Sequence, residues 1–138
     1  MSLARSYLED AKRFFEDRLY HWSVLSCQLS VENSAKAVIS CFRPPSWMHD
    51  SGPELTQVMG EHERAIADCL REEEITELRN LAKASTELAP EHGAATYGFV
   101  NERKLPIEVY DERSSGRALS LADRSYITAQ KFLRRWFT

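Results

Sequence analysis

The segment from residue 20 to residue 42 constrains the fold most, because it is apolar around more than half of a helix. At a rotation of about 100° per residue, with Gln28 set to zero, one seam covers about −100° to −20°. It consists of Val24, Cys27, Val31, Ala35, Val38 and Phe42. Leu25, Leu29 and Ile39 extend the apolar surface beyond it, and the opposite face carries small residues. Such a helix belongs in the middle of a bundle or in an oligomer contact.

The rest of the chain is also mostly helical in pattern. Apolar residues at helical spacing predict helices over 3–18, 53–69, 75–88 and 120–136, in addition to 20–42. Arg43-Pro44-Pro45 ends the second helix, and the SLAD sequence from Ser120 fits the capping box of the last. Residues 89–118 contain prolines and glycines and predict a long loop with brief extended pieces at TYGFV and IEVY. The sequence therefore predicts a single all-α domain over 1–138, a bundle of about five helices with a long loop before the last.

Composition narrows the classes of protein. The chain has 138 residues, of which 43% are hydrophobic and 28% charged, as expected of one globular domain. Three cysteines without CxxC spacing, no long apolar run and a charged N-terminus favour a cytoplasmic protein without a membrane span or signal peptide. Residues 101–138 carry 8 Lys/Arg against 5 Asp/Glu. This excess suits an anionic partner, or simply the C-terminal end of a helix dipole.

A polar row crosses the apolar helix, since Gln28, Glu32 and Lys36 recur at every fourth position. Glu32 falls at about +40° and Lys36 at about +80°, among leucines and an isoleucine. A charge in such a sector needs a partner, and Glu32 four residues before Lys36 is the favourable order for a salt bridge. Two interpretations remain open: the pair neutralises itself at the edge of a packed face, or it lines a subunit interface or polar cleft.

The same stretch, QLSVENSAKAVI, resembles the signature helix of HEPN domains (higher eukaryotes and prokaryotes nucleotide-binding). Gln28, Glu32 and Lys36 fit the family pattern, and Asn33 stands where a lysine is usual. His49 falls where many members carry a histidine before the third helix. Further similarity lies in YLEDAKRFFEDRLYHWS, ELRNLAKAS, TYGFV and SYITAQKFLRRWF, so that the resemblance covers nearly the whole chain.

The resemblance implies an antiparallel bundle with a four-helix up-and-down core, usually a homodimer and often encoded beside a minimal nucleotidyltransferase in a toxin–antitoxin pair. Many members are metal-independent ribonucleases with Arg, often Asn, and then a histidine about four to six residues on. Arg79-Asn80 matches the front of that motif, but residues 83–86 read Lys-Ala-Ser-Thr, and His92 lies beyond Pro90. Loss of a proton-transfer histidine costs roughly 10²–10⁴-fold in rate.

These observations predict a HEPN-like module that binds a nucleotide, RNA or a partner nucleotidyltransferase. In the expected ligand cleft lie Arg79, Asn80, Tyr97, Arg103 and Lys104. The alternative is a ribonuclease that uses His49 or His92, for which Arg43 and His49 offer a weak match to the arginine–histidine spacing. A third is a purely protein-binding role. No cofactor or metal is expected, since Cys41, His49, His62 and Cys69 match no zinc spacing.

Overall fold

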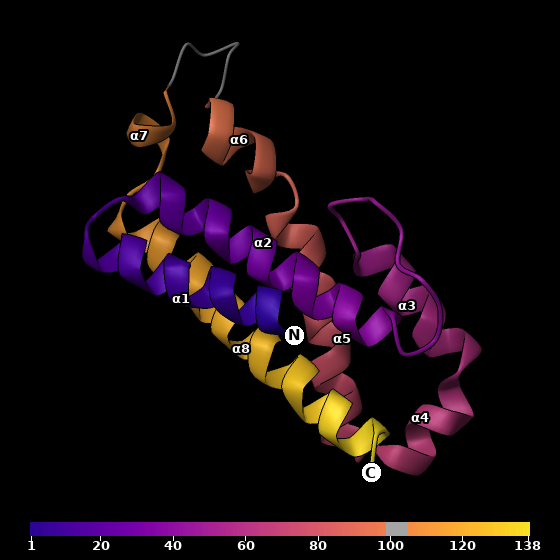
Figure 1. The fold of residues 1–138 in the computed structure, drawn as a ribbon. Coiled ribbons are helices and arrows are strands. Elements are labelled where there is room, and N and C mark those ends of the chain that lie inside the picture. Colours follow the sequence, from indigo (N-terminus) through magenta and orange to yellow (C-terminus); the bar gives the residue numbers. More distant parts are fainter. Residues whose placement is uncertain (99–104) are drawn as a thin grey trace.

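The computed structural model describes residues 1–98 and 105–138, which form an all-helical bundle (Figure 1). The described residues contain eight helices and no strand. Their bounds are α1 Ser2–Glu16, α2 Tyr20–Ile39, α3 Gly52–Glu61, α4 Glu63–Cys69, α5 Glu72–Leu88, α6 Glu91–Tyr97, α7 Pro106–Val109 and α8 Glu112–Trp136. The all-α prediction is confirmed. None of these helices has the length and hydrophobicity that crossing a membrane requires.

Four long helices, α1, α2, α5 and α8, make the body of the bundle, with α3 and α4 at one end and α6 and α7 at the other (Figure 1). Helix α2 lies at the centre and contacts α1, α3, α5, α6, α7 and α8. Helix α1 runs antiparallel to α2, because Ser23 contacts Ala11 while Ser30 contacts Ala4. Helix α5 is likewise antiparallel to α8, since ion pairs join its first turn to the end of α8 and its last turn to the start.

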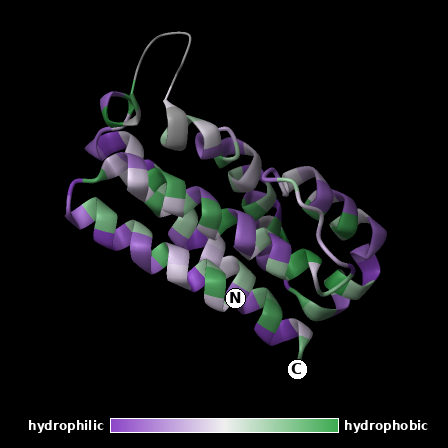
Figure 2. Ribbon diagram, turned by 45° about the horizontal axis from the view of Figure 1, so that its top comes forward, coloured by the Kyte–Doolittle hydropathy of each residue, from purple (hydrophilic) through white to green (hydrophobic). Residues whose placement is uncertain are grey.

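The central position of α2 follows from its sequence. Its apolar seam is buried from Val24 to Val38, whereas Phe42 lies beyond the helix and is partly buried. Hydropathy follows the packing, with hydrophobic residues on the sides that face other helices (Figure 2). The small face opposite packs on α1, where the hydroxyls of Ser23 and Ser30 donate to the carbonyls of Ala11 and Ala4, both at 2.8 Å. The apolar girth of this helix is therefore used within the protomer.

Two boundaries predicted from the sequence are wrong. The expected helix over 53–69 is broken at His62, which ends α3 and precedes α4. The last helix begins at Glu112 and not at Ser120, because Asp111 caps it by accepting from the Ser114 amide at 2.8 Å. The segment expected as a loop thus contains α6, α7 and the first turns of α8. The first three residues of IEVY are helical where an extended piece was expected, and only Tyr110 is extended.

Candidate functional site

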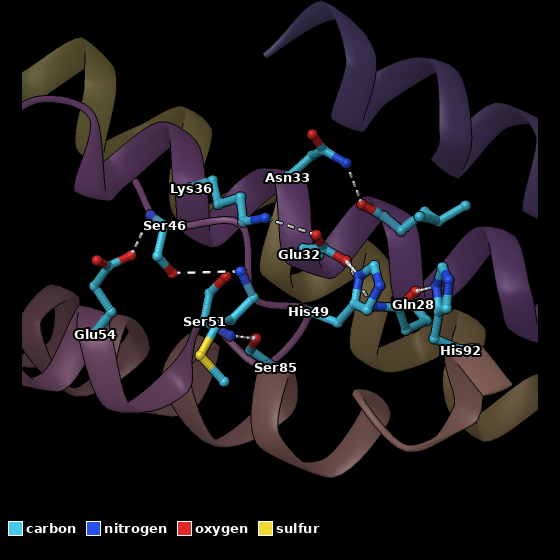
Figure 3. Close-up of polar contacts among 12 residues, drawn as sticks. Gln28, Glu32, Asn33, Lys36, Ser46, His49, Ser51, Glu54, Ser85 and His92 are labelled. Carbon is cyan, nitrogen blue, oxygen red and sulfur yellow. Dashed lines mark hydrogen bonds and ion pairs between the residues drawn. The ribbon is translucent and has the colours of Figure 1, made fainter. Parts of the chain in front are cut away.

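The polar row of α2 is a hydrogen-bonded network at the edge of the packed region (Figure 3). The Glu32 side chain is only 8% exposed. Its Oε1 accepts from Lys36 Nζ at 2.7 Å, and its Oε2 accepts from Gln28 Nε2 at 2.8 Å. The predicted salt bridge is therefore formed, and a buried neutral donor supplements it.

His49 joins this network from the loop between α2 and α3. Its Nδ1 lies 3.1 Å from Glu32 Oε2, while about half of its side chain stays exposed. The next two residues fix the loop to α5, since the Asp50 carboxylate accepts from Thr86 Oγ1 at 2.9 Å and the Ser51 amide donates to Ser85 Oγ at 3.0 Å. The loop after the double proline is thereby held so that it presents a histidine to α2.

His92 completes the cluster from α6, which the turn at 89–90 sends back over α2. Its Nδ1 lies 3.0 Å from Gln28 Oε1, and its ring stacks on that of His49 with centroids 3.8 Å apart (Figure 3). The sequence places His92 too far from Arg79-Asn80 to complete the family motif. The structure brings it to a different partner, the signature helix, 64 residues away in the chain.

Hydrogen-bond chemistry assigns the tautomers of both rings. The Gln28 amide nitrogen is committed to a carboxylate, so its oxygen faces His92 and requires a proton on Nδ1. The ionised Glu32 carboxylate can only accept, so Nδ1 of His49 is also the protonated nitrogen. In the neutral rings the lone pair therefore lies on Nε2.

The charges of the cluster follow from its burial and its partners. Desolvation alone would raise the pKa of Glu32, but hydrogen bonds from Lys36, Gln28 and His49, together with the charge of Lys36, leave that pKa below its ordinary value. For His92, desolvation and then the neighbouring His49 lower the pKa, against the opposite influence of Glu32. At neutral pH the cluster thus combines a carboxylate, an ammonium and a neutral His92 imidazole.

Such an arrangement supports three kinds of chemistry. The ammonium and imidazole groups can bind an anionic oxygen, and an imidazole can transfer a proton. The donor atoms of Glu32, His49 and His92 also lie within 4.8 Å of one another, a spacing from which a metal ion can be held.

The other predicted site residues are dispersed. Arg79 and Asn80 are both exposed on α5 but face different surfaces, since Arg79 lines a hollow beside α3 and Asn80 a groove beside α8. Arg43 forms ion pairs with two carboxylates of α3, Glu54 at 3.6 Å and Glu61 at 3.9 Å. Its charge is therefore paired with α3 and not with the histidine cluster.

For three of the predicted ligand-binding residues, the structure does not describe the side chain. Tyr97 is the last residue of α6, and only its backbone is described. Arg103 and Lys104 lie outside the described residues.

The fold and this cluster define a class of all-helical bundles with a buried carboxylate on the central helix and a histidine held against it. Residues 1–123 match the family model of the HEPN domain, and the chain belongs to the HEPN family. The resemblance seen in the sequence is therefore confirmed. No curated protein and no solved structure matches this chain.

Proposed function

We propose that this HEPN domain binds the phosphate of a nucleotide or of RNA at the cluster of Glu32, Lys36, His49 and His92. The observation that carries the proposal is the contact of both histidines with the signature helix. The Lys36 ammonium donates one of its three N–H groups to Glu32, which leaves two for a ligand. The Lys36 side chain is 18% exposed, so a ligand can approach it from solvent. The remaining N–H groups of the ammonium suit a phosphate oxygen. An imidazole can add a donor only when its Nε2 is also protonated, because each Nδ1–H is used within the cluster.

Binding of labelled single-stranded RNA and of ATP, measured by fluorescence anisotropy in buffer with EDTA, tests the proposal. Lys36→Met removes one donor to a charged group, which is worth about 1.5–3 kcal/mol, or roughly a 10- to 150-fold loss of affinity. His49→Gln tests whether the imidazole contributes as well. The matched control is Lys12→Met, because Lys12 is an exposed lysine whose ion pair with Asp123 joins α1 to α8. Equal affinities for the Lys36 and Lys12 variants would refute the site.

The same titration tests Arg79 and Asn80. If these residues extend the binding surface along α5, Arg79→Ala weakens RNA binding. It should also reduce the slope of log affinity against log salt concentration by the amount that corresponds to about one phosphate contact. Binding unchanged by this substitution removes Arg79 from the site, and leaves the histidine cluster as the place of contact.

A metal-independent ribonuclease is the second candidate, favoured by an imidazole held beside a lysine. Nε2 of one ring would accept the 2′-hydroxyl proton while the 2′-oxygen attacks phosphorus, which forms a 2′,3′-cyclic phosphate and releases the 5′-oxygen with a proton from an acid. Rings stacked at 3.8 Å leave no room for a phosphate between them, so in this proposal the acid would come from the second protomer of a homodimer. Cleavage in EDTA that His49→Ala and His92→Ala abolish, and His62→Ala does not, would support it. Intact RNA would refute it.

The exposed aromatic side chains of this domain suit an interface with a partner protein. We infer a homodimer and a minimal nucleotidyltransferase partner from the family, and exposed aromatic residues support an interface, since Trp47 is 98% and Trp22 45% exposed. Light scattering of the purified protein tests the dimer, and co-purification with a nucleotidyltransferase encoded beside it tests the partner. A monomeric mass at every protein concentration would refute the proposed homodimer.

A further inference from the structure

We propose that Glu32, His49 and His92 form a binding site for a divalent transition-metal ion, with Zn²⁺ as the ion that this donor set suits best. The three residues come from α2, the α2–α3 loop and α6 (Figure 3). An ion bound there would cross-link all three segments. This inference does not rest on phosphate binding, because it concerns the protein without a nucleotide.

Geometry is the first argument. Zinc bonds of about 2.0–2.1 Å place neighbouring ligand atoms of a tetrahedron roughly 3.3 Å apart. His49 Nδ1 and Glu32 Oε2 are already 3.1 Å apart, and all three donors lie within 4.8 Å of one another. The longest donor separation must therefore shorten by about 1.5 Å or less. The two rings, which are stacked with their planes 19° apart, must also turn so that both ring planes meet at the ion. His49 is half-exposed, and a rotation of its side chain can supply that movement.

The second argument is the type of donor. Two imidazoles and one carboxylate are typical ligands of zinc and of its neighbours in the transition series. Magnesium and calcium prefer oxygen ligands alone and are disfavoured here. Three protein ligands at a partly exposed site leave a position for water or for an anion.

The residues around these donors orient them as supporting residues do in metal sites. The Gln28 carbonyl oxygen accepts from Nδ1 of His92, which directs the Nε2 lone pair to coordination. Lys36 occupies Oε1 of Glu32, so Oε2 faces the metal, where the ion takes the place of the His49 hydrogen bond. His49 then binds through Nδ1 as its Nε2–H tautomer, and no net proton is released from the neutral ring.

Calorimetric titration of EDTA-treated, dialysed protein with ZnCl₂ tests the site, and the visible absorption of the Co²⁺ form reports its coordination. We expect one ion per chain, and a loss of affinity of roughly tenfold or more for His49→Ala, His92→Ala and Glu32→Gln. His62→Ala is the matched control, because its ring packs against Phe42 at 4.6 Å and takes no part in the cluster. Circular dichroism confirms that each variant is folded.

Lys36 separates this proposal from phosphate binding. Its ammonium repels a cation held by the same carboxylate, so Lys36→Met should bind Zn²⁺ about three- to tenfold more tightly, whereas it should bind RNA more weakly. No zinc binding by the unmodified protein in the micromolar range would overturn the metal site. So would zinc affinity that His92→Ala leaves unchanged, whatever the outcome with RNA.

Discussion

The salt bridge between Glu32 and Lys36 should be worth more than a surface pair, and a double-mutant cycle measures the difference. The variants are Glu32→Ala, Lys36→Ala and the combination of both. In the native protein the Glu32 side chain is 8% exposed and that of Lys36 is 18% exposed, and their charged atoms lie 2.7 Å apart. The low exposure reduces solvent screening, and the short distance holds each charge in one geometry.

The size of each effect follows from the groups left behind. Glu32→Ala deprives Lys36, Gln28 and His49 of their acceptor at once. Gln28 is 1% exposed, so its amide loses a partner that water cannot replace, at a cost of about 1–3 kcal/mol, and the ammonium adds to it. We expect Glu32→Ala to cost about 3–4 kcal/mol, close to the range for a broken buried pair. Lys36→Ala should cost about 1–2 kcal/mol, since two donors still hold the carboxylate.

The cycle gives the interaction directly. Removing Lys36 as well eliminates the unpaired ammonium, so the double variant should be more stable than Glu32→Ala alone. The coupling energy should therefore exceed the cost of Lys36→Ala and reach about 2–3 kcal/mol. Urea unfolding followed by circular dichroism at 222 nm provides the free energies of unfolding. Arg5 and Glu9 form the matched control, an i,i+4 pair on α1 with side chains 68% and 64% exposed. Its coupling should be about 0.3–0.5 kcal/mol.

Equal coupling energies for the two pairs would refute the reasoning, because the Glu32 pair would then behave as a solvated one. The same result would also weaken the inference that the network holds the histidines, since a screened carboxylate cannot orient a ring.

Two further predictions concern other parts of the bundle. Gly52→Ala should cost more than about 2 kcal/mol, because a Cβ at this position would meet the Ala82 carbonyl oxygen at 2.5 Å, whereas Gly60→Ala, with nothing within 4 Å, should stabilise α3 by about 0.5–1 kcal/mol. Equal urea midpoints for the two variants would contradict this packing. Burial raises the pKa of the Cys27 thiol to about 12, so at pH 8 it stays protonated and should react with a disulfide reagent at least 100-fold more slowly in the native protein than in urea. Rapid labelling of Cys27 in the native state would show that α2 is not closed on all sides.

Most of the fold was predictable because it depends on local pattern. The start and the buried course of α2 follow from its apolar seam, although the helix ends at Ile39, three residues before the predicted end at Phe42. The pairing of Glu32 with Lys36 follows from the sector in which they lie. The start of α8 was missed because Gly116 suggested a loop. In the structure this glycine is helical, and a Cβ there would make only an ordinary van der Waals contact with the Phe15 ring at 3.7 Å, so the glycine does not interrupt α8.

The contact of His92 with the signature helix was not predictable in the same way. It depends on the direction in which the chain leaves α5, and no local pattern encodes the direction of a turn followed by a seven-residue helix. One signal was present, however. Gln28 is polar and falls beside the apolar seam, where an amide needs two kinds of partner, a donor and an acceptor. Glu32 satisfies only its nitrogen, so a donor from elsewhere in the chain had to reach its oxygen.

The amide of Gln28 therefore links the fold to the site. It hydrogen-bonds both the carboxylate and His92, and its two ends are chemically distinct, so it permits only one arrangement of the hydrogen bonds around it. Burial of Glu32 is unfavourable until Lys36, Gln28 and His49 are all in place. Folding of α2 into the bundle thus favours the same loop and α6 positions that bring the two imidazoles together. A ligand that contacts those imidazoles, whether a phosphate or a metal ion, would meet them already close together, and its binding would in turn stabilise the contacts of α6 with α2.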